Sequence, residues 1–540
     1  MGQKYQHWLS RSNEIPQNYE DVRRIIEKNR NFQPAGQLDY GNFGLEDAYQ
    51  KIRTGIQNNQ RIALYADYDV DGTMSCVSWI WFFQAIGFKN YIHYIPHRQR
   101  EGYGVNLSAV RYLVEEQQAN IVVTMDTGIT ANEEAQWCRE RGVDFICTDH
   151  HKIQSENMPD CIILNPQTHP DPMYQQLCGC GVTFVLLRRL GQDFEVALEV
   201  WSDLLAITAM ATICDVVPLG GVNHRLVQTG VKTLMKSRRP VLRKLLEACK
   251  VQGVQEQDVG FRLGPRINAV GRLEDANAVV EAFLSEDPSE LIQHMEECNE
   301  KRKVFQKRIV AEAKAQAATK SEEAIVFQGG DWHPGVVGIA AGRLADELWK
   351  PVWLFHRGAD ICRGSARSIP DLDVTDMMSQ CKEYFVGFGG HSAAGGFSFL
   401  PENEKPLMEK LQKIGQEKKQ KDIALWESRA SYDCLLPDHL LDETLLETLD
   451  SLRPFGHGFE APEFCLNAEI QKVQHYKDRK TQKPTHTALW TQSGRKIMFF
   501  HEVLDPTPGS KAQFLVQPSR NEWQGKTSVS LVAKDIQLTF

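Results

Sequence analysis

The segment Leu64-Tyr65-Ala66-Asp67-Tyr68-Asp69-Val70-Asp71-Gly72 decides how this chain folds. It completes an apolar run, Ile62–Ala66, that has the length and composition of a buried strand. If the chain stays extended beyond that run, alternate side chains point the same way, and Asp67, Asp69 and Asp71 converge. Crowded like charges need either a bound cation or a solvated acidic turn, and the triplet alone leaves both interpretations open.

Two further apolar runs end in candidate ligands. Ile121–Met125 precedes Asp126, and Asp144–Thr148 precedes Asp149, His150 and His151. Short apolar runs that alternate with amphipathic stretches are typical of a mostly parallel α/β sheet, and ligands bind such sheets beyond the carboxyl ends of the strands. We therefore predict that the three strand ends form one site.

Asp215 is a further candidate, because it ends the apolar helix-like run 204–214. Taken alone, Asp215 is better explained as a helix-end residue, and His151 equally well as a residue that orients a ligand. Together with the strand ends, they offer enough carboxylates and imidazoles for two divalent ions that share an aspartate. Oxygen donors with added nitrogen and no thiolate favour Mn²⁺, with Mg²⁺ as the second choice. Two such ions about 3.5–4 Å apart can activate water for in-line phosphoryl displacement.

The composition is that of a folded multidomain protein. A chain of 540 residues exceeds a single core, and 42% hydrophobic with 24% charged residues is ordinary for globular domains. No apolar run reaches about 18 residues and the polar start lacks a secretory signal, which predicts a cytoplasmic protein without a membrane segment. The net charge of −9 argues against a protein that coats nucleic acid over its whole surface. Cys178-Gly179-Cys180 lacks the second ligand pair of a structural zinc site.

The rest of the chain changes character in stages. The stretch that follows Ala276 is rich in Glu, Lys, Ala and Gln and predicts one or two long helices. A second α/β unit begins at Ala324–Phe327, and alternating aromatic and β-branched stretches near the end predict an OB-like β-barrel. The predicted domains are an N-terminal extension packed on the core (1–55), an α/β catalytic domain with a mostly parallel sheet (56–275), a helical connector (276–322), a second α/β domain (323–425) and the barrel (426–540).

An ordered set of motifs resembles a known superfamily. DYDVDG, MDTG, TDHH and CDVVP look like the four motifs of the DHH phosphoesterases. EGYGVN, GPRINAVGR, WHPGVVGIAAGRL, RGSARS and GGHSAAGG resemble the RecJ branch of that superfamily, from about residue 60 to the C-terminus. The resemblance implies a DHH-type sheet domain, a DHHA1 domain and an OB-like domain. The sequence departs from the family at 454–462, where Phe459 and Glu460 replace the usual Asn and Pro.

The resemblance also implies a role for each candidate ligand. Asp69 and Asp126 would bind one ion, with Asp67 completing or supporting its shell. The other ion would be bound by Asp71, Asp126, His150 and Asp215. Asp149 and His151 would orient ligands or reach the scissile phosphate. No separate protein nucleophile is expected, because a hydroxide on the two ions suffices.

Phosphate contacts are expected from arginines beside the glycine-bearing motifs, because a guanidinium grips phosphate at two points. For any single arginine a surface ion pair is the simpler explanation. The RecJ resemblance implies that a cleft between the catalytic and second domains captures a terminal 5′ phosphate. The candidate substrate-binding residues are Arg98, Arg266, Arg272, Ser365, Arg367 and His391.

The predicted barrel carries aromatic and basic residues of the kind that bind single strands in OB-folds. For each aromatic side chain, a place in the barrel core is the simpler interpretation. The aromatic candidates are Trp490, Phe499, Phe500 and Trp523, and the basic ones are Lys477, Arg479, Lys480 and Lys483.

We therefore predict a single-stranded-DNA-specific exonuclease that degrades 5′ to 3′ and releases 5′-mononucleotides in DNA repair and recombination. The alternative enzyme is a DHH phosphodiesterase for short oligoribonucleotides or cyclic dinucleotides, which usually lacks a barrel. A silent scaffold would lack the metal ligands, and all of them are present here. The resemblance makes a single-strand-binding protein and a helicase candidate partners of an expected monomer.

Overall fold

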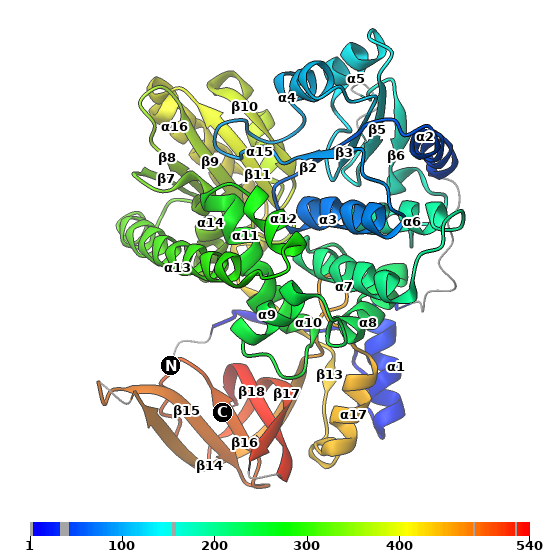
Figure 1. The fold of residues 1–540 in the computed structure, drawn as a ribbon. Coiled ribbons are helices and arrows are strands. Elements are labelled where there is room, and N and C mark those ends of the chain that lie inside the picture. Colours follow the sequence, from blue (N-terminus) through cyan, green and yellow to red (C-terminus); the bar gives the residue numbers. More distant parts are fainter. Residues whose placement is uncertain (1–3, 33–42, 154–157, 479–480, 524–525, 540) are drawn as a thin grey trace. The chain divides into compact units, whose positions relative to one another are not determined.

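The computed structural model describes residues 4–32, 43–153, 158–478, 481–523 and 526–539 (Figure 1). The chain divides into two compact units. The parallel-sheet unit comprises residues 33–304 and 454–459, and the barrel unit comprises residues 1–32, 305–453 and 460–540. Within the described ranges, no helix combines the length and apolar character needed to cross a bilayer.

Five parallel strands in the order β3-β2-β4-β5-β6 form the sheet of the parallel-sheet unit. The strands are β2 (Ile62–Ala66), β3 (Tyr91–Tyr94), β4 (Ile121–Met125), β5 (Asp144–Thr148) and β6 (Ile162–Leu164). The three strands predicted from the sequence are β2, β4 and β5, and their predicted bounds are confirmed. The strand order reverses between β2 and β4, which is where open α/β sheets bind ligands.

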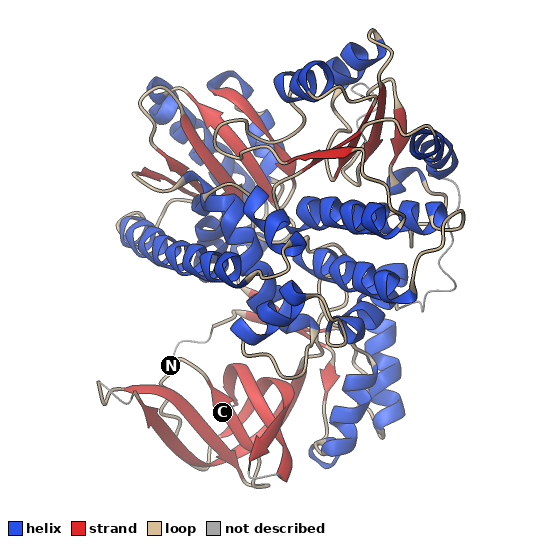
Figure 2. Ribbon diagram, in the orientation of Figure 1, coloured by secondary structure: helices blue, strands red, loops and turns tan. Residues whose placement is uncertain are grey.

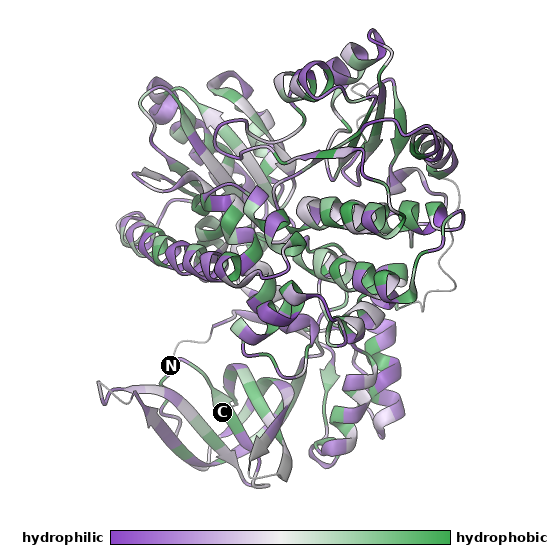
Figure 3. Ribbon diagram, viewed as in Figure 1, coloured by the Kyte–Doolittle hydropathy of each residue, from purple (hydrophilic) through white to green (hydrophobic). Residues whose placement is uncertain are grey.

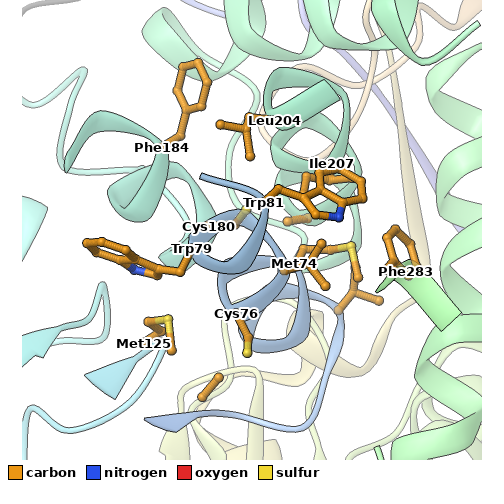
Figure 4. Packing of buried hydrophobic residues seen from close by; sticks show 14 of the residues in the cluster. Met74, Cys76, Trp79, Trp81, Met125, Cys180, Phe184, Leu204, Ile207 and Phe283 are labelled. Carbon is orange, nitrogen blue, oxygen red and sulfur yellow. The ribbon is translucent and has the colours of Figure 1, made fainter. Parts of the chain in front are cut away.

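Alternate residues of β2 enter two different cores. Leu64 belongs to the larger core, whereas Tyr65 belongs to the smaller core on the other face of the sheet. Figure 4 shows the larger core, where Trp79 and Trp81 of α3 lie among side chains of the surrounding helices. Because α3 is enclosed on all sides, it is apolar around most of its circumference. Figure 3 shows that α7 is also largely hydrophobic.

Helices surround this sheet (Figure 2). The sequence-predicted connector consists of α12 and α13, and the boundary between the units falls within α13, between Val304 and Phe305. The helices from α2 to α13, with the π-helical turns η1 and η4, are α2 (Leu45–Gln57), α3 (Val70–Ala85), α4 (Leu107–Arg111), η1 (Tyr112–Glu116), α5 (Asn132–Arg139), α6 (Gly179–Leu190), α7 (Leu198–Cys214), α8 (Gly221–Leu234), α9 (Pro240–Ala248), α10 (Glu256–Asp258), η4 (Val259–Leu263), α11 (Gly264–Leu273), α12 (Asn277–Leu284) and α13 (Ser289–Ala318).

The barrel unit contains a second α/β domain, as predicted. Its sheet has the order β10-β11-β9-β8-β7, and only the β7–β8 pair is parallel. The glycine-rich sequence GFGGHSAAGGF forms the hairpin of β10 and β11. The elements are β7 (Val326–Gly330), α14 (Pro334–Leu348), β8 (Val352–His356), β9 (Cys362–Arg367), α15 (Val374–Ser379), β10 (Phe385–His391), β11 (Ala394–Phe399) and α16 (Glu404–Lys421).

Five strands close into the predicted barrel. Their order is β14-β15-β16-β18-β17, and pairing of β17 back onto β14 closes the ring, with β16 and β18 parallel. Closure removes the exposed edges of the sheet. The barrel strands are β14 (Phe464–Lys477), β15 (Pro484–Thr491), β16 (Lys496–Phe499), β17 (Lys511–Trp523) and β18 (Lys526–Thr539), and β13 (Cys434–Leu435) pairs with β14 outside the ring.

The predicted N-terminal extension is divided between the units. α2 belongs to the parallel-sheet unit, whereas β1 (His7–Ser10) pairs with β12 (Arg429–Tyr432) and α1 (Tyr19–Asn29) packs on α17 (Glu443–Ser451). A buried ion pair between Arg30 and Asp433 fixes this junction, and Nδ2 of Asn29 donates to Asp433 at 3.0 Å. The first 32 residues are therefore part of the barrel unit.

Candidate metal centre

The aspartate triplet lies at the turn from β2 into α3. The strand ends at Ala66, and Asp69 caps α3, with its carboxylate accepting from the backbone N–H of Asp71 at 2.9 Å and of Gly72 at 3.2 Å. The expectation of an extended segment was wrong, because this cap starts a helix within the triplet. Asp71 lies in the first turn of α3, so it points to a different group of residues from Asp67 and Asp69.

The N-terminus of α6 holds the carboxylate of Asp71. The backbone N–H of Gly179 donates to Oδ2 at 2.6 Å, and that of Cys180 donates to Oδ1 at 2.8 Å. Both bonds satisfy amides that have no partner within the helix, and the positive end of the helix dipole favours the negative charge. The motif Cys178-Gly179-Cys180, weighed above only as a zinc ligand pair, therefore serves to orient Asp71. The contact was missed because α6 follows the triplet by more than a hundred residues.

The strand ends lie next to one another at the edge of the sheet. The backbone N–H of Asp67 donates to Met125 at 3.3 Å, and that of Asp126 donates to Thr148 at 3.0 Å, each just past the paired strand residues. Asp126 has a left-handed backbone conformation, with φ of 59°. Non-glycine residues in that conformation carry strain and are concentrated at functional sites.

His150 lies among three of the acids. Its Nε2 is 3.1 Å from Oδ1 of Asp126, 3.5 Å from Oδ2 of Asp215 and 3.8 Å from Oδ2 of Asp71. Asp215 comes from the C-terminal end of α7, where it caps the helix and is followed by Val216 in a left-handed conformation. It is thus both a helix-end residue and a member of the cluster.

The ligand atoms fall into groups whose members lie within 4.8 Å of one another. One group contains Asp67, Asp69 and Asp126, and a second contains Asp71, His150 and Asp215. A third joins Asp126 to His150 and His151, so Asp126 links the first group to the second through His150. The structure thus brings the sequence-predicted ligands together, and their binding of metal stays a prediction.

Burial and repulsion from neighbouring aspartates disfavour charge on four carboxylates when no cation is bound, those of Asp67, Asp71, Asp126 and Asp215. Burial raises the pKa of Asp126 and Asp67 well above the usual range, and the neighbouring aspartates raise it further. Burial and then Asp69 raise the pKa of Asp71 to about 6. Oδ1 of Asp67 and Oδ1 of Asp126 are buried and accept no hydrogen bond from the residues that the structure describes. Divalent cations with a preference for oxygen ligands fit this donor set.

Asp149 anchors the two histidines. Its carboxylate accepts from the backbone N–H of Ile129 at 3.0 Å and of His150 at 2.7 Å, and lies 2.7 Å from Nδ1 of His151. Burial raises the pKa of Asp149, but the hydrogen bond with His151 and the positive charge nearby outweigh burial and lower it to about 2. On the other side, Nε2 of His151 lies 3.1 Å from the hydroxyl of Tyr103, a residue not singled out from the sequence.

Replacing Asp149 with alanine is expected to lower the free energy of unfolding of the metal-free protein by about 3–5 kcal/mol, because buried donors lose their acceptor. Manganese affinity should fall about 10–100-fold, as expected when a ligand loses its orienting partner. Urea denaturation and a manganese titration measure the two effects. Asp160→Ala, at a side chain that is 85% exposed, should change stability by less than about 0.5 kcal/mol. Equal behaviour of the two variants would contradict the anchoring role.

The GPRINAVGR motif supports the aspartate turn from α11. Oδ1 of Asn268 accepts from the backbone N–H of Val70 at 3.2 Å. Gly271 packs so closely that a Cβ at that position would lie 2.4 Å from the carbonyl oxygen of Tyr68. The motif was interpreted from its arginines alone, so Asn268 was missed.

The structure separates the candidate phosphate-binding residues into three sets. In the parallel-sheet unit, Arg98 stacks 4.9 Å from the ring of Tyr68, and Arg98 and Arg272 both oppose the rise in the pKa of Tyr68 that burial causes. Arg266 pairs with Glu296 of α13 and donates to the carbonyl of Arg262 at 2.7 Å, which favours a structural role. In the barrel unit, Arg367 donates to Ser365, and His391 is exposed at the end of β10.

Three family models match the chain. They are the DHH family N-terminal domain at residues 61–212, the DHHA1 domain at 321–417 and the RecJ OB domain at 432–535. The first match contains the strand ends that carry Asp67, Asp126 and Asp149, and Asp215 lies just beyond it. These four residues and Asp69, Asp71, His150 and His151 are here called the acidic cluster. Fold and site therefore define a protein of the DHH class.

Curated relatives narrow the class to a family. The single-stranded-DNA-specific exonuclease RecJ of Bacillus subtilis is 30% identical over 509 residues, which cover 91% of this chain and 63% of that protein. Its counterpart from Haemophilus influenzae is 30% identical over 386 residues, or 67% of each chain. The fold is similar to that of RecJ in complex with Mn²⁺ from Thermus thermophilus, with a TM-score of 0.84 at 23% identity over 98% of this chain and 79% of that one. The chain belongs to the RecJ family.

Proposed function

We propose that this chain is a single-stranded-DNA-specific exonuclease that hydrolyses phosphodiester bonds from the 5′ end and releases 5′-mononucleotides. The observation that carries the proposal is the division of the acidic residues into two ligand groups that Asp126 links. The Bacillus and Haemophilus relatives are single-stranded-DNA-specific exonucleases, which supports the choice of single-stranded DNA. In this role the protein would work in the cytoplasm in DNA repair and recombination, as a monomer, with a single-strand-binding protein and a helicase as candidate partners.

Two divalent ions, with Mn²⁺ preferred over Mg²⁺, would be held by Asp69, Asp71, Asp126, His150 and Asp215. When bound, such ions supply an activated water and neutralise charge that develops on the phosphate. The surrounding chain keeps the ligands in place. The amides at the start of α6 fix Asp71, Asp149 fixes His151, and Asn268 fixes the start of α3. Preorganisation of this kind removes the cost of reorienting ligands during the reaction.

The barrel favours a polymeric substrate over a dinucleotide. Lys472, Trp490 and Lys496 are cross-strand partners on β14, β15 and β16. The two ammonium groups lie 5.1 and 5.6 Å from the Trp490 ring. A ring between two cations offers a base a stacking surface and its phosphates a countercharge. Phe499 is buried in the barrel core and Phe500 is 51% exposed; Arg479, Lys480 and the side chain of Trp523 lie outside the described part of the chain.

Replacing Trp490 with alanine is expected to weaken binding of long single strands roughly 5- to 150-fold, which corresponds to the loss of one base–aromatic stack. Hydrolysis of a dinucleotide, which has no run of further bases to stack on the barrel, should be unchanged and serves as the internal control. Fluorescence anisotropy with a labelled oligonucleotide measures the binding. Unchanged affinity for the long strand would show that Trp490 and its neighbouring lysines do not bind the substrate.

Replacing Arg98 with alanine is expected to raise KM for 5′-phosphorylated strands about 10- to 150-fold, because a charged hydrogen bond to phosphate is lost. KM for strands with a 5′ hydroxyl should change little. Arg100→Ala, two residues along the same segment, is the matched control and should leave both values unchanged. An equal rise for both substrates would show that Arg98 supports the fold of the site instead of the terminal phosphate.

The proposed function is tested by a time course with Mn²⁺ on 5′-labelled and 3′-labelled strands, single and duplex. We expect label from the 5′ end to appear at once as mononucleotide, and the 3′-labelled strand to shorten progressively. Duplex substrate should persist. Preferential cleavage of oligoribonucleotides or cyclic dinucleotides would instead favour the phosphodiesterase alternative.

A further inference from the structure

A second group of metal-ligating side chains lies within the parallel-sheet unit but outside the acidic cluster. Glu274 follows the last residue of α11, and His294 and Cys298 lie one turn apart on α13. Their ligand atoms lie within 4.8 Å of one another. The sulfur of Cys298 distinguishes this group, here called the Glu-His-Cys triad, from the acidic cluster, whose groups contain only carboxylates and imidazoles.

The two distances from His294 to the other members of the triad are close to the edges of a tetrahedron around zinc. Nε2 of His294 lies 3.0 Å from Oε2 of Glu274 and 3.7 Å from Sγ of Cys298. Ordinary Zn–N, Zn–O and Zn–S bonds at tetrahedral angles place these atom pairs about 3.4 and 3.6 Å apart. Displacements of a few tenths of an ångström would therefore bring His294 into tetrahedral geometry with each of the other two ligands, and the ligand atoms of Glu274 and Cys298 lie within 4.8 Å of each other. The residues i and i+4 of a helix face the same side, so α13 presents both of its ligands together.

We propose that the Glu-His-Cys triad is a zinc site, with water as the fourth ligand. A carboxylate and a thiolate balance the two positive charges of the ion, and the thiol proton of Cys298 passes to solvent on binding. Cys298 is buried, while the side chains of Glu274 and His294 are 39% and 34% exposed, so the ion would enter from their side. Thiolate and imidazole select Zn²⁺ over Mn²⁺, which separates this site from the acidic cluster.

One neighbouring cation competes with the ion. Nζ of Lys301 lies 3.5 Å from Oε1 of Glu274, and its side chain is 57% exposed. A long exposed lysine can turn into solvent at little cost, because exposed ion pairs contribute little to stability. The zinc site would therefore replace one counterion of Glu274 with another. It would also tie the residue after α11 to α13, next to the pairing of Arg266 with Glu296 on the same two helices.

Cobalt substitution tests the proposal on the full-length protein after removal of metals by a chelator. A thiolate bound to Co²⁺ gives a charge-transfer absorption in the near ultraviolet, which ligation by the acidic cluster alone does not give. We expect this absorption in the parent protein and in Asp126→Ala. It should be absent in Cys298→Ser, and the affinity for cobalt should fall at least about tenfold in His294→Gln. Added Zn²⁺ should remove the absorption, and Mn²⁺ at the same concentration should not.

Cys249→Ser is the matched control, because it removes another buried thiol of the same unit from outside the triad. It should keep the absorption. A parent protein without the absorption, or a Cys298→Ser variant that retains it, would overturn the proposal. If circular dichroism shows that Cys298→Ser does not fold, the test rests on His294→Gln, which changes a side chain that is only partly buried. Unchanged cobalt affinity in that variant would also overturn the proposal. None of these readouts depends on nuclease activity, so the proposed function and the zinc site can fail separately.

Discussion

Asp126→Ala is expected to lower the manganese-dependent kcat/KM on single-stranded DNA by at least about a thousandfold, because several kcal/mol of metal-based stabilisation are lost. Asp126 belongs to one ligand group and its Oδ1 lies 3.1 Å from Nε2 of His150 in the other, so its removal disturbs both proposed ions. Asp215→Ala removes a ligand from only one group and should cost less. Initial rates with a labelled oligonucleotide, together with manganese stoichiometry, measure these effects.

Asp144→Asn is the matched control for this experiment. Asp144 lies on the same sheet at the opposite end of β5, where Lys51 contacts it at 3.0 Å. The control should keep nearly full activity, and circular dichroism should show the same fold for all three variants. Retention of more than about a tenth of the parent activity by Asp126→Ala would rule out a bridging aspartate at this position.

Gly179→Ala is expected to lower activity about a hundredfold, although it adds only one methyl group. A Cβ at position 179 would lie 2.6 Å from Cβ and 2.9 Å from Cα of Asp126. Backbone must move to relieve these contacts, and Gly179 and Cys180 would then lose the geometry with which their amides hold Asp71. A displacement of about 1 Å in a catalytic group can cost a hundredfold in rate.

Gly181→Ala, two residues further along α6, tests whether this effect is specific. Its Cβ would meet the tip of the Leu177 side chain at 3.1 Å, and that side chain can yield. This control should retain most of the activity and of the manganese affinity. Similar losses in both variants would mean that α6 tolerates no added methyl group at either position. The loss in Gly179→Ala would then not be due to its contact with Asp126.

The strands that carry the site could be predicted to the residue. β2, β4 and β5 are buried on both faces, so their sequences are unbroken apolar runs that stop where the polar ligands begin. The aspartate triplet was harder, because alternation along a strand and capping of a helix compete for the same three residues. The structure has the helix cap, because the carboxylate of Asp69 accepts hydrogen bonds from two backbone N–H groups.

Residues that support the site could not be identified from the sequence. Gly179 and Asn268 act on the aspartate turn from helices far along the chain, and neither has a side-chain chemistry that marks it as functional. For Arg266 the sequence did not indicate the packing partner either, since its motif predicts phosphate binding while its guanidinium also pairs with Glu296. Such partnerships depend on how helices pack, which apolar periodicity does not encode.

The pairing of β1 with β12 has a consequence for the order in which the protein matures. His7 lies beside Arg429, and Arg30 is buried with Asp433, so His7 and Arg30 must wait during synthesis for partners made some four hundred positions later. Most of the parallel-sheet unit, residues 33–304, is synthesised in one stretch between them and can begin to fold first. Until β12 has been synthesised, β1 remains an unpaired strand edge that can associate with other nascent chains.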